Sequence, residues 1–149
     1  MKICVHYNVK NDPWGGGNQF LRALINQFRE NQTLSSSLDR AEVHLFNSHQ
    51  KIREVVQAVR KHPNATFIQR LDGPMRLYND RLDSRDTIAF LLTKYIADGV
   101  VFQSQWSRRE ALKRGVIKQD QKTIVIHNSA DEKIFFRPLQ TKKSSGKVR

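Results

Sequence analysis

The stretch KICVHYNVKNDPWGGGNQFLRALINQF, residues 2–28, joins three sequence types that together indicate a fold class. KICVHYN (2–8) is short, rich in apolar residues and followed by the turn-prone NVKNDP, which is typical of a buried strand. Three glycines follow, and a helical stripe comes after them. The stripe consists of Phe20, Leu21, Leu24, Ile25 and Phe28. The segment therefore predicts a strand, a glycine loop and a helix.

The same alternation continues along the chain. Strands are predicted in AEVHLFNS (41–48), ATFIQRL (65–71), GVVFQS (99–104) and KTIVIHNS (122–129). Helices are predicted between them, from an apolar stripe at 52–59, from RDTIAFLLTKYIAD (85–98) and from a short segment beginning at 107. The residues expected to begin or end these helices are Ser48, His62 with Pro63, Gly99, the capping box of Ser107 and Glu110, and Gly115.

Apolar strands that alternate with helices predict an α/β fold, a Rossmann-like three-layer sandwich with a mainly parallel sheet. In such sheets, ligands bind outside the carboxyl ends of the strands, beside the point where the strand order reverses. This rule selects the glycine loop and four further strand ends, at 47–50, 70–74, 103–106 and 127–129.

Length and charge limit the class of protein. The chain has 149 residues, enough for one domain, and a formal net charge of +12. Residues 137–149 hold five of the basic residues and no acid. The charge suits partners that carry phosphate, including an anionic membrane surface. Nucleic acid is an unlikely partner, because no recognition motif is present and aromatic and basic residues seldom alternate.

Cys4 is the only cysteine, so no internal disulfide can form, and a buried, inert thiol is expected. We find neither an apolar run of membrane-spanning length nor a secretory signal, and we expect a cytoplasmic protein that could also contact the inner face of a membrane. Metal binding is poorly supported, because His44, His49 and His62 do not share a helix face with carboxylates and there is no cysteine pair.

The glycine loop is the first candidate site. Gly15, Gly16, Gly17 and Asn18 would place free backbone N–H groups at a helix N-terminus, which favours a diphosphate. The motif is neither G-x-G-x-x-G nor a Walker loop. A plain tight turn is the alternative interpretation.

The segment RLDGP, at the end of the third predicted strand, is the second candidate. Arg70, Asp72 and Gly73 supply a guanidinium, a carboxylate and a turn. Asp72 could accept hydrogen bonds from sugar hydroxyls or act as a catalytic base. The alternative is an Asx turn with Arg70 as the ion-pair partner of Asp72.

The last two strand ends carry polar and aromatic groups that suit carbohydrate. These residues are Gln103, Ser104, Trp106, His127 and Asn128. Two of them have simpler alternatives, since Ser104 could only cap a helix and His127 could be a structural histidine. Arginines at 76, 81 and 85 lie among acids at 80, 83 and 86, which favours a charge-compensated surface over a phosphate clamp.

Taken together, these strand ends resemble a known family. VVFQSQWSRREALKRGV (100–116) followed by IVIHNSADEKIFFRP (124–138) resembles the end of the first domain of family 4 retaining glycosyltransferases. GGGNQFLRAL and QRLDGP lie where that family places its first glycine loop and its acceptor-side loop. The resemblance spans residues 2–138. One difference is N-S-A-D at 128–131, where the family has N-G-V-D.

The resemblance implies one half of a GT-B architecture. Residues 1–138 would form the N-terminal, acceptor-side domain, and 139–149 would be a linker or the start of a missing C-terminal, donor-binding domain, whose paired-glutamate motif is absent. The co-substrate would be a nucleotide-diphosphate sugar, with no further cofactor, and the acceptor a carbohydrate or a lipid-linked sugar.

The family positions also imply roles for particular residues. Gly15 to Gly17 would lie near the donor diphosphate, Asp72 and Gly73 near the acceptor and the reacting carbon, and His127 and Asn128 near the cleft between the domains. The isolated chain would be inactive. The alternative is a stand-alone binding subunit that docks a donor-binding partner or an anionic membrane carrying a lipid acceptor.

Overall fold

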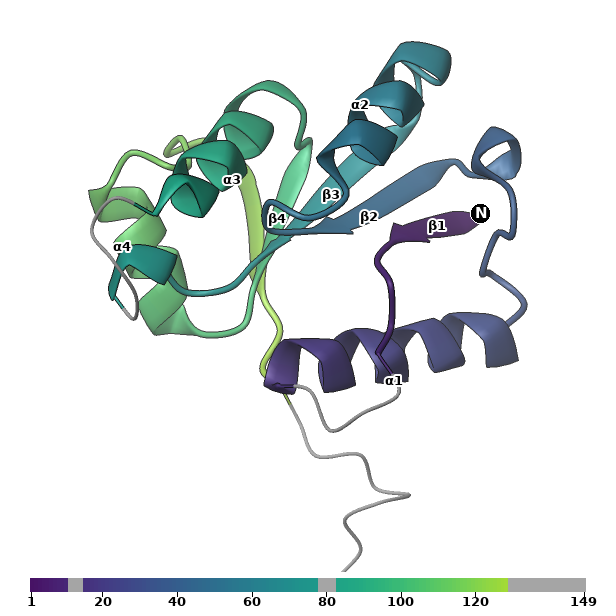
Figure 1. The fold of residues 1–149 in the computed structure, drawn as a ribbon, viewed down its shortest axis with the longest axis horizontal. Coiled ribbons are helices and arrows are strands. Elements are labelled where there is room, and N and C mark those ends of the chain that lie inside the picture. Colours follow the sequence, from purple (N-terminus) through teal and green to yellow (C-terminus); the bar gives the residue numbers. More distant parts are fainter. Residues whose placement is uncertain (11–14, 78–82, 129–149) are drawn as a thin grey trace, which may run out of the picture.

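The computed structural model describes residues 1–10, 15–77 and 83–128 (Figure 1). Within them, strands and helices alternate as predicted. The strands are β1 (Ile3–His6), β2 (Val43–Asn47), β3 (Thr66–Leu71), β4 (Gly99–Phe102) and β5 (Lys122–Val125). The α-helices are α1 (Gly16–Glu30), α2 (Ile52–Lys61), α3 (Ser84–Tyr95) and α4 (Gln105–Lys113), and two 3-10 turns are η1 (Leu38–Arg40) and η2 (Met75–Leu77).

The five strands form one sheet in the order β1-β2-β3-β4-β5, and every neighbouring pair is parallel. The predicted Rossmann-like α/β fold is therefore confirmed. Parallel pairing places the carboxyl ends of all five strands at one edge of the sheet, which is the edge that sequence analysis selected for ligands.

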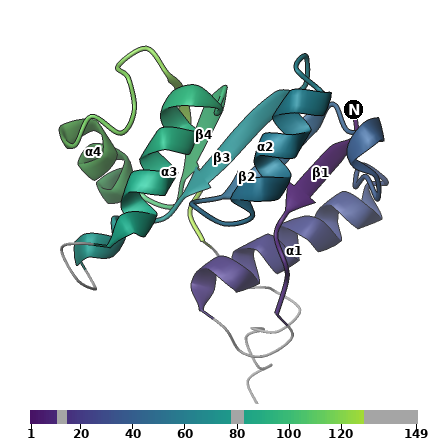
Figure 2. The same cartoon turned by 45° about the horizontal axis from the view of Figure 1, so that its top comes forward.

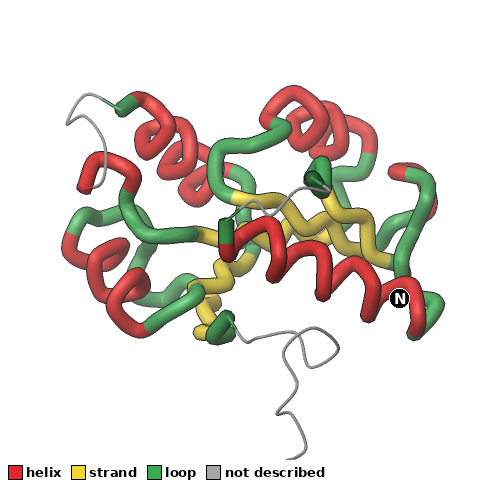
Figure 3. Tube along the Cα trace, turned by 60° about the horizontal axis from the view of Figure 1, so that its bottom comes forward, coloured by secondary structure: helices red, strands yellow, loops and turns green. Residues whose placement is uncertain are grey.

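The helices cover both faces of the sheet, as Figures 1 and 2 show for α1 on one side and α2 and α3 on the other. On the α2 face, Phe46 of β2 packs in a buried cluster with Val55 of α2 and Leu92 of α3. The opposite face presents Arg70, whose guanidinium carbon lies 4.7 Å from the ring centre of Phe20 in α1. The strands are thus the middle layer of a three-layer sandwich (Figure 3).

Helix α4 lies on the same face as α2 and α3. Its Ala111 belongs to a second buried cluster that includes Leu71 of β3 and Phe102 of β4. Leu71 and Phe102 are register partners, and Leu71 is four residues after Phe67, so all three point to the α2 face because side chains alternate along a strand.

The side of β1 on which the chain adds its next segment changes between α1 and β2. After α1 it returns along the free edge of β1, where the N–H of Ile3 donates to the carbonyl of Thr33 and the N–H of Ser35 donates to the carbonyl of Ile3. It then passes to the other side of β1 to form β2, and each later strand adds on that side. The topological switch point therefore lies between β1 and β2.

Two of the expected helix boundaries are confirmed. Helix α2 ends at Lys61, immediately before His62 and Pro63. Helix α4 ends at Lys113, and Gly115 follows in the left-handed region with φ of 64°. The N–H of Gly115 donates to Leu112 and that of Val116 to Ala111, the double hydrogen bond of a Schellman motif.

Three expected boundaries are wrong. Lys51, not Ser48, is the residue before α2, because Ser48 is in a left-handed turn whose N–H donates to the carbonyl of Arg70. Gly99 is not a C-cap but the first residue of β4, where a Cβ would lie 3.2 Å from Cδ1 of Ile68.

The predicted capping box of Ser107 and Glu110 is the third wrong boundary. Helix α4 begins one turn earlier, and Oγ of Ser104 accepts from the N–H of Ser107 at 3.1 Å. Ser107 is itself in the first turn of α4, and Glu110 forms ion pairs with Lys113 and Arg114 instead of reaching back to a cap.

The α1 face of the sheet is only partly covered by the described residues. Ile124 of β5 is 56% exposed and Ile126 is 43% exposed. Both lie on the face opposite to Phe102, away from α4. No helix within the described parts of the chain is long and apolar enough to span a lipid bilayer.

Candidate functional site at the carboxyl edge of the sheet

Arg70, at the end of β3, organises the carboxyl edge of the sheet. Its side chain is 1% exposed, although a guanidinium is charged and is seldom buried without partners. Its Nη1 donates to Oδ1 of Asn47 at 2.9 Å and to Oδ1 of Asp72 at 2.7 Å, and its Nη2 donates to Oδ1 of Asn128 at 3.3 Å. Strands β2 and β3 and the segment after β5 are thereby joined at one side chain.

The first turn of α1 packs directly on this network. A Cβ at Gly17 would lie 3.6 Å from Nη1 of Arg70 and 3.7 Å from Oδ2 of Asp72, and a Cβ at Gly16 would lie 3.7 Å from Nδ2 of Asn128. These are ordinary contact distances. A Cβ would therefore fit at positions 16 and 17 without displacing the Arg70 network, whereas Gly15 has a φ of 30°, which L side chains rarely adopt.

Helix α1 begins without a side-chain cap at Gly15, and its first turn contains no acidic residue. An α-helix leaves its first N–H groups unpaired and carries a partial positive charge at this end. The N–H of Asn18 already donates to the carbonyl of Gly15, and no described residue accepts from the amides of Gly16 and Gly17, so these two amides can receive an anion. Residues 11–14, which directly precede the glycines, lie outside the described part of the chain.

Asp72 lies between the first turn of α1 and a cavity beside α3 and α4. Its Oδ1 accepts from Arg70, and no described residue donates a hydrogen bond to its Oδ2, which faces Gly17. The side chain is 24% exposed. Both interpretations of RLDGP therefore remain compatible with the geometry, since Asp72 is an ion-pair partner of Arg70 and still has one carboxylate oxygen to offer.

A cavity of about 280 Å³ opens on the other side of Asp72, between the end of β3 and helices α3 and α4. Its wall combines apolar and charged groups. The apolar lining includes Leu71, Pro74, Ala89, Phe90, Ala111 and Val116, and the polar lining includes Ser48, Asp72, Arg76, Asp86, Thr87, Ser107 and Arg114, with Gly73 at the rim. Such a mixture can hold a small polar molecule that has an apolar face.

Two titratable side chains near Asp72 have shifted pKa values. Burial raises the pKa of Tyr7, and the charge of Asp72 raises it further while Arg70 lowers it. Burial also lowers the pKa of His49, as does the charge of Arg85, although nearby acids including Asp72 oppose this shift. His49 follows β2 at the carboxyl edge of the sheet. This edge therefore brings a neutral imidazole near the carboxylate of Asp72.

Asn18 is 2% exposed and bonds to protein atoms. Its Oδ1 accepts from the N–H of Lys10 at 2.9 Å and from the hydroxyl of Tyr7 at 3.2 Å, and its Nδ2 donates to the carbonyl of Lys10 at 2.9 Å. The side chain therefore fastens the start of α1 to the segment that leaves β1.

We expect Asn18→Ala to lower the free energy of unfolding by about 1–3 kcal/mol, because the Asn18 side chain loses two buried hydrogen-bonding groups and Lys10 loses two partners. Urea denaturation followed by circular dichroism measures this difference. Asn26→Ala in the exposed part of α1 is the matched control and should change stability by less than about 0.5 kcal/mol. Equal effects of the two variants would contradict the fastening role.

The remaining predicted residues divide between the network and the surface. Asn128 donates from Nδ2 to Oε1 of Gln103 at 3.0 Å, so both belong to the Arg70 network. Ser104 caps α4, as its simpler interpretation held. Trp106 is 40% exposed in the first turn of α4. His127 is exposed, and no hydrogen bond or ion pair joins it to a described residue of the network.

The charged residues after β3 pair with one another within the described segments. Arg76 bonds Asp86 at 3.1 Å and Arg85 bonds Asp83 at 2.5 Å. Asp86 also accepts from the backbone N–H groups of Met75 and Arg76, which fixes η2 at the start of α3. These residues form the charge-compensated surface that was expected, while positions 80 and 81 lie outside the described residues.

Sequence reasoning missed two members of the Arg70 network. Asn47 was within the selected strand end at 47–50 but was not chosen, and Phe20 was assigned only to a helix stripe. A signal for Asn47 exists, because a polar residue that directly follows an apolar strand in a parallel sheet is buried and needs a partner. No local signal places Phe20 under the Arg70 guanidinium.

Comparison with known proteins adds no relative, since no family profile, curated protein or solved structure matches this chain. What is established is therefore the class of fold, a Rossmann-like α/β domain with an all-parallel five-stranded sheet.

Proposed function

We propose that this chain is the acceptor-side domain of a retaining glycosyltransferase of GT-B architecture, which transfers a sugar from a nucleotide-diphosphate sugar. The observation that carries the proposal is the position of Asp72, between the first turn of α1 on one side and the 280 Å³ cavity on the other. The family resemblance of residues 2–138 and the Rossmann-like fold are consistent with this proposal.

The donor side of the proposed site is the uncapped start of α1. A diphosphate there would receive hydrogen bonds from the free amides of the first turn and would benefit from the helix dipole. Arg70 supports this arrangement indirectly. Its guanidinium is already bonded to Asn47, Asp72 and Asn128, so it positions the edge and does not serve as a free phosphate ligand.

The acceptor side is the cavity beside Asp72. Sugars present apolar C–H faces together with hydroxyl groups, and Phe90 and Leu71 provide apolar surface beside the charged groups of Arg76 and Arg114. No described residue donates a hydrogen bond to Oδ2 of Asp72, which faces Gly17, so an acceptor hydroxyl that extends from the cavity past Asp72 toward α1 can donate to it. Asp72 would then orient the attacking oxygen next to the donor diphosphate.

The proposal assigns only half of the chemistry to this chain. The departing diphosphate needs hydrogen-bond donors on both of its sides. A second domain would hold the nucleotide and supply the hydrogen-bond donors that this chain lacks. The isolated chain should therefore bind nucleoside diphosphates weakly, with Kd on the order of 1 mM, and should not transfer sugar at rates typical of enzymes.

Substitutions at Gly16 test the donor side. Gly16 has no left-handed backbone, and among the described residues a Cβ there would meet only Nδ2 of Asn128, at 3.7 Å, so both Gly16→Asp and Gly16→Asn should fold. The aspartate is favourable for the helix but repels a diphosphate, whereas asparagine has the same shape without the charge. We expect Gly16→Asp to weaken binding of UDP or GDP by about 10-fold or more, and Gly16→Asn to change it by less than about threefold.

Calorimetric titration at low salt measures both affinities. Equal affinities of the aspartate and asparagine variants would place the nucleotide away from α1 and would reject the donor side of the proposal. Sugar transfer by the isolated wild-type chain at an ordinary enzymatic rate would reject the proposed division between two domains.

A further inference from the structure

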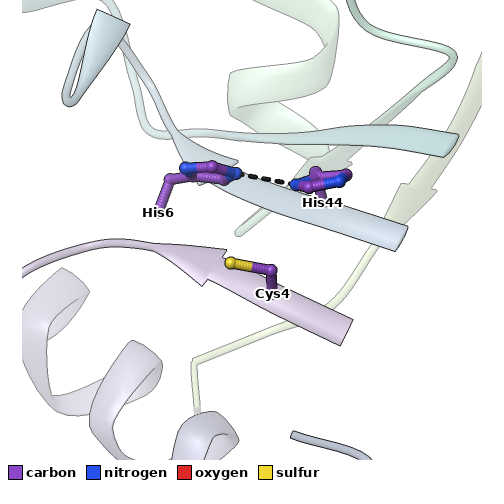
Figure 4. Close-up of side chains that lie close together, drawn as sticks. All are labelled: Cys4, His6 and His44. Carbon is purple, nitrogen blue, oxygen red and sulfur yellow. Dashed lines mark hydrogen bonds between the residues drawn. The ribbon is translucent and has the colours of Figure 1, made fainter. Parts of the chain in front are cut away.

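Three potential metal ligands meet on the α2 face of the sheet, which is opposite to the face that holds the Arg70 guanidinium. Cys4 and His6 are two residues apart on β1 and therefore point to the same face, and His44 of β2 is the register partner of Cys4. One ligand atom from each residue lies within 4.8 Å of the others. Figure 4 shows the two imidazoles side by side, with the sulfur of Cys4 beneath them.

The two imidazole nitrogens are spaced as ligands of a single ion, and the sulfur lies within 4.8 Å of them, compared with roughly 3.6 Å on one tetrahedral Zn²⁺. Nε2 of His6 lies 3.0 Å from Nδ1 of His44. Two imidazole nitrogens bound to one tetrahedral Zn²⁺ at about 2.0–2.1 Å would be separated by roughly 3.3 Å, so only a small movement is needed. The nitrogens of His6 and His44 share a hydrogen bond, which accounts for their short separation.

The protonation of the cluster is compatible with metal binding. His6 is 2% exposed and His44 is fully buried. Burial lowers the pKa of both imidazoles, that of His6 to about 4, so both are neutral at physiological pH, as ligands must be. No described residue bonds Nε2 of His44, so this nitrogen can carry the ring proton while Nδ1 binds an ion.

Glu54 of α2 is a candidate for the fourth ligand. Helix α2 covers this face of the sheet and the charge of Glu54 acts on both Cys4 and His6, but its carboxylate is not among the ligand atoms that lie within 4.8 Å of one another. Glu54 pairs with Lys51 at 2.6 Å, and its side chain is 47% exposed. It could therefore leave the lysine for an ion, or a water molecule could complete the four-coordinate site that Zn²⁺ prefers.

We propose that Cys4, His6 and His44 bind one Zn²⁺ ion, with Glu54 or water as the fourth ligand. The thiol loses its proton when it binds the metal, and the proton is released to solvent. The ion would join β1 to β2 beside the topological switch point, and it would hold the strand from which the chain continues toward the glycine turn. This inference does not depend on the proposed glycosyltransferase function.

The test uses the full chain, reduced and freed of metal with a chelator, and titrated with Zn²⁺ in competition with a chelating dye. We expect one Zn²⁺ per chain and a higher melting temperature of the loaded protein. Cys4→Ser changes one half-buried atom and should fold, but it should weaken Zn²⁺ binding by more than about 100-fold, since even the loss of an outer partner costs roughly 10–100-fold.

Co²⁺ in place of Zn²⁺ identifies the ligands. The wild-type protein should show a sulfur-to-cobalt charge-transfer band, which Cys4→Ser should abolish. His127→Gln, which removes an exposed histidine distant from the cluster in sequence, is the matched control and should retain both the band and the affinity. Failure of the wild-type chain to bind Zn²⁺, or an identical Co²⁺ spectrum for Cys4→Ser, would overturn the proposal.

Discussion

Replacing Arg70 with methionine is expected to lower the free energy of unfolding by about 3 kcal/mol. Methionine fills much of the same space but donates no hydrogen bonds. Asn47, which is 5% exposed, would lose a buried partner, and Asp72 would lose the charge that compensates it. Loss of one member of a buried ion pair typically costs 3–5 kcal/mol, and we take the lower end because Asp72 is partly exposed.

Arg76→Met is the matched control for Arg70. Arg76 also bonds an aspartate, at 3.1 Å, but its side chain is 43% exposed. Surface pairs contribute about 0–1 kcal/mol, so this variant should be close to wild type in urea denaturation. A loss of less than about 1 kcal/mol for Arg70→Met would show that the network does not hold the carboxyl edge together.

Replacing Phe46 with alanine should have an equally large effect, of about 3–5 kcal/mol. Phe46 is fully buried between β2 and the helices α2 and α3, where it contacts a cluster that includes Val55 and Leu92. Removing the ring takes away apolar contacts and leaves a cavity that the packed helices cannot fill completely.

Ile124→Ala is the matched control, because it truncates an exposed strand residue instead of a buried one. Ile124 is also an apolar strand residue, but it lies in β5 and is 56% exposed on the α1 face. We therefore expect a change of less than about 0.5–1 kcal/mol by thermal or urea denaturation. A destabilisation similar to that of Phe46→Ala would mean that a further part of the chain covers β5.

The order of strands and helices could be predicted from the sequence because each element carries its own periodic pattern. KICVHYN and ATFIQRL indicate strands, and the stripe after the glycines indicates α1. Helix ends were harder to predict. The capping box of Ser107 and Glu110 was wrong because Ser104, three residues earlier, is an equally good cap, and local sequence does not decide between them.

The site could be predicted only in outline. The rule for parallel sheets grouped the strand ends at one edge, and the structure brings Arg70, Asp72, Asn128 and Gln103 together there. Their mutual bonds join positions up to 58 residues apart, and only the register of the sheet determines them. The cluster of Cys4, His6 and His44 could not be predicted for the same reason. Only the register of β1 with β2 brings these residues together, and a helix separates the two strands in the sequence.

The glycine run illustrates the difference between a pattern and its cause. Sequence reasoning assigned the close approach at Gly15 to Gly17 to a diphosphate. The structure places the side chains of Arg70, Asp72 and Asn128 at Gly16 and Gly17, so the protein itself approaches these two residues. The proposed anion-binding role then depends on the amides of Gly16 and Gly17, to which no described residue offers an acceptor, and not on the number of glycines.

The most direct test of the account is a ¹⁵N chemical-shift map of the wild-type chain titrated with a nucleoside diphosphate and, separately, with a simple glycoside. The account predicts that the diphosphate shifts the amides of Gly16, Gly17 and Asn128, and that the glycoside shifts residues around the cavity, including Gly73 and Phe90. Asp72 should respond to both. Shifts confined to the opposite edge of the sheet, or none with either ligand at millimolar concentration, would contradict a sugar-transfer site at this edge.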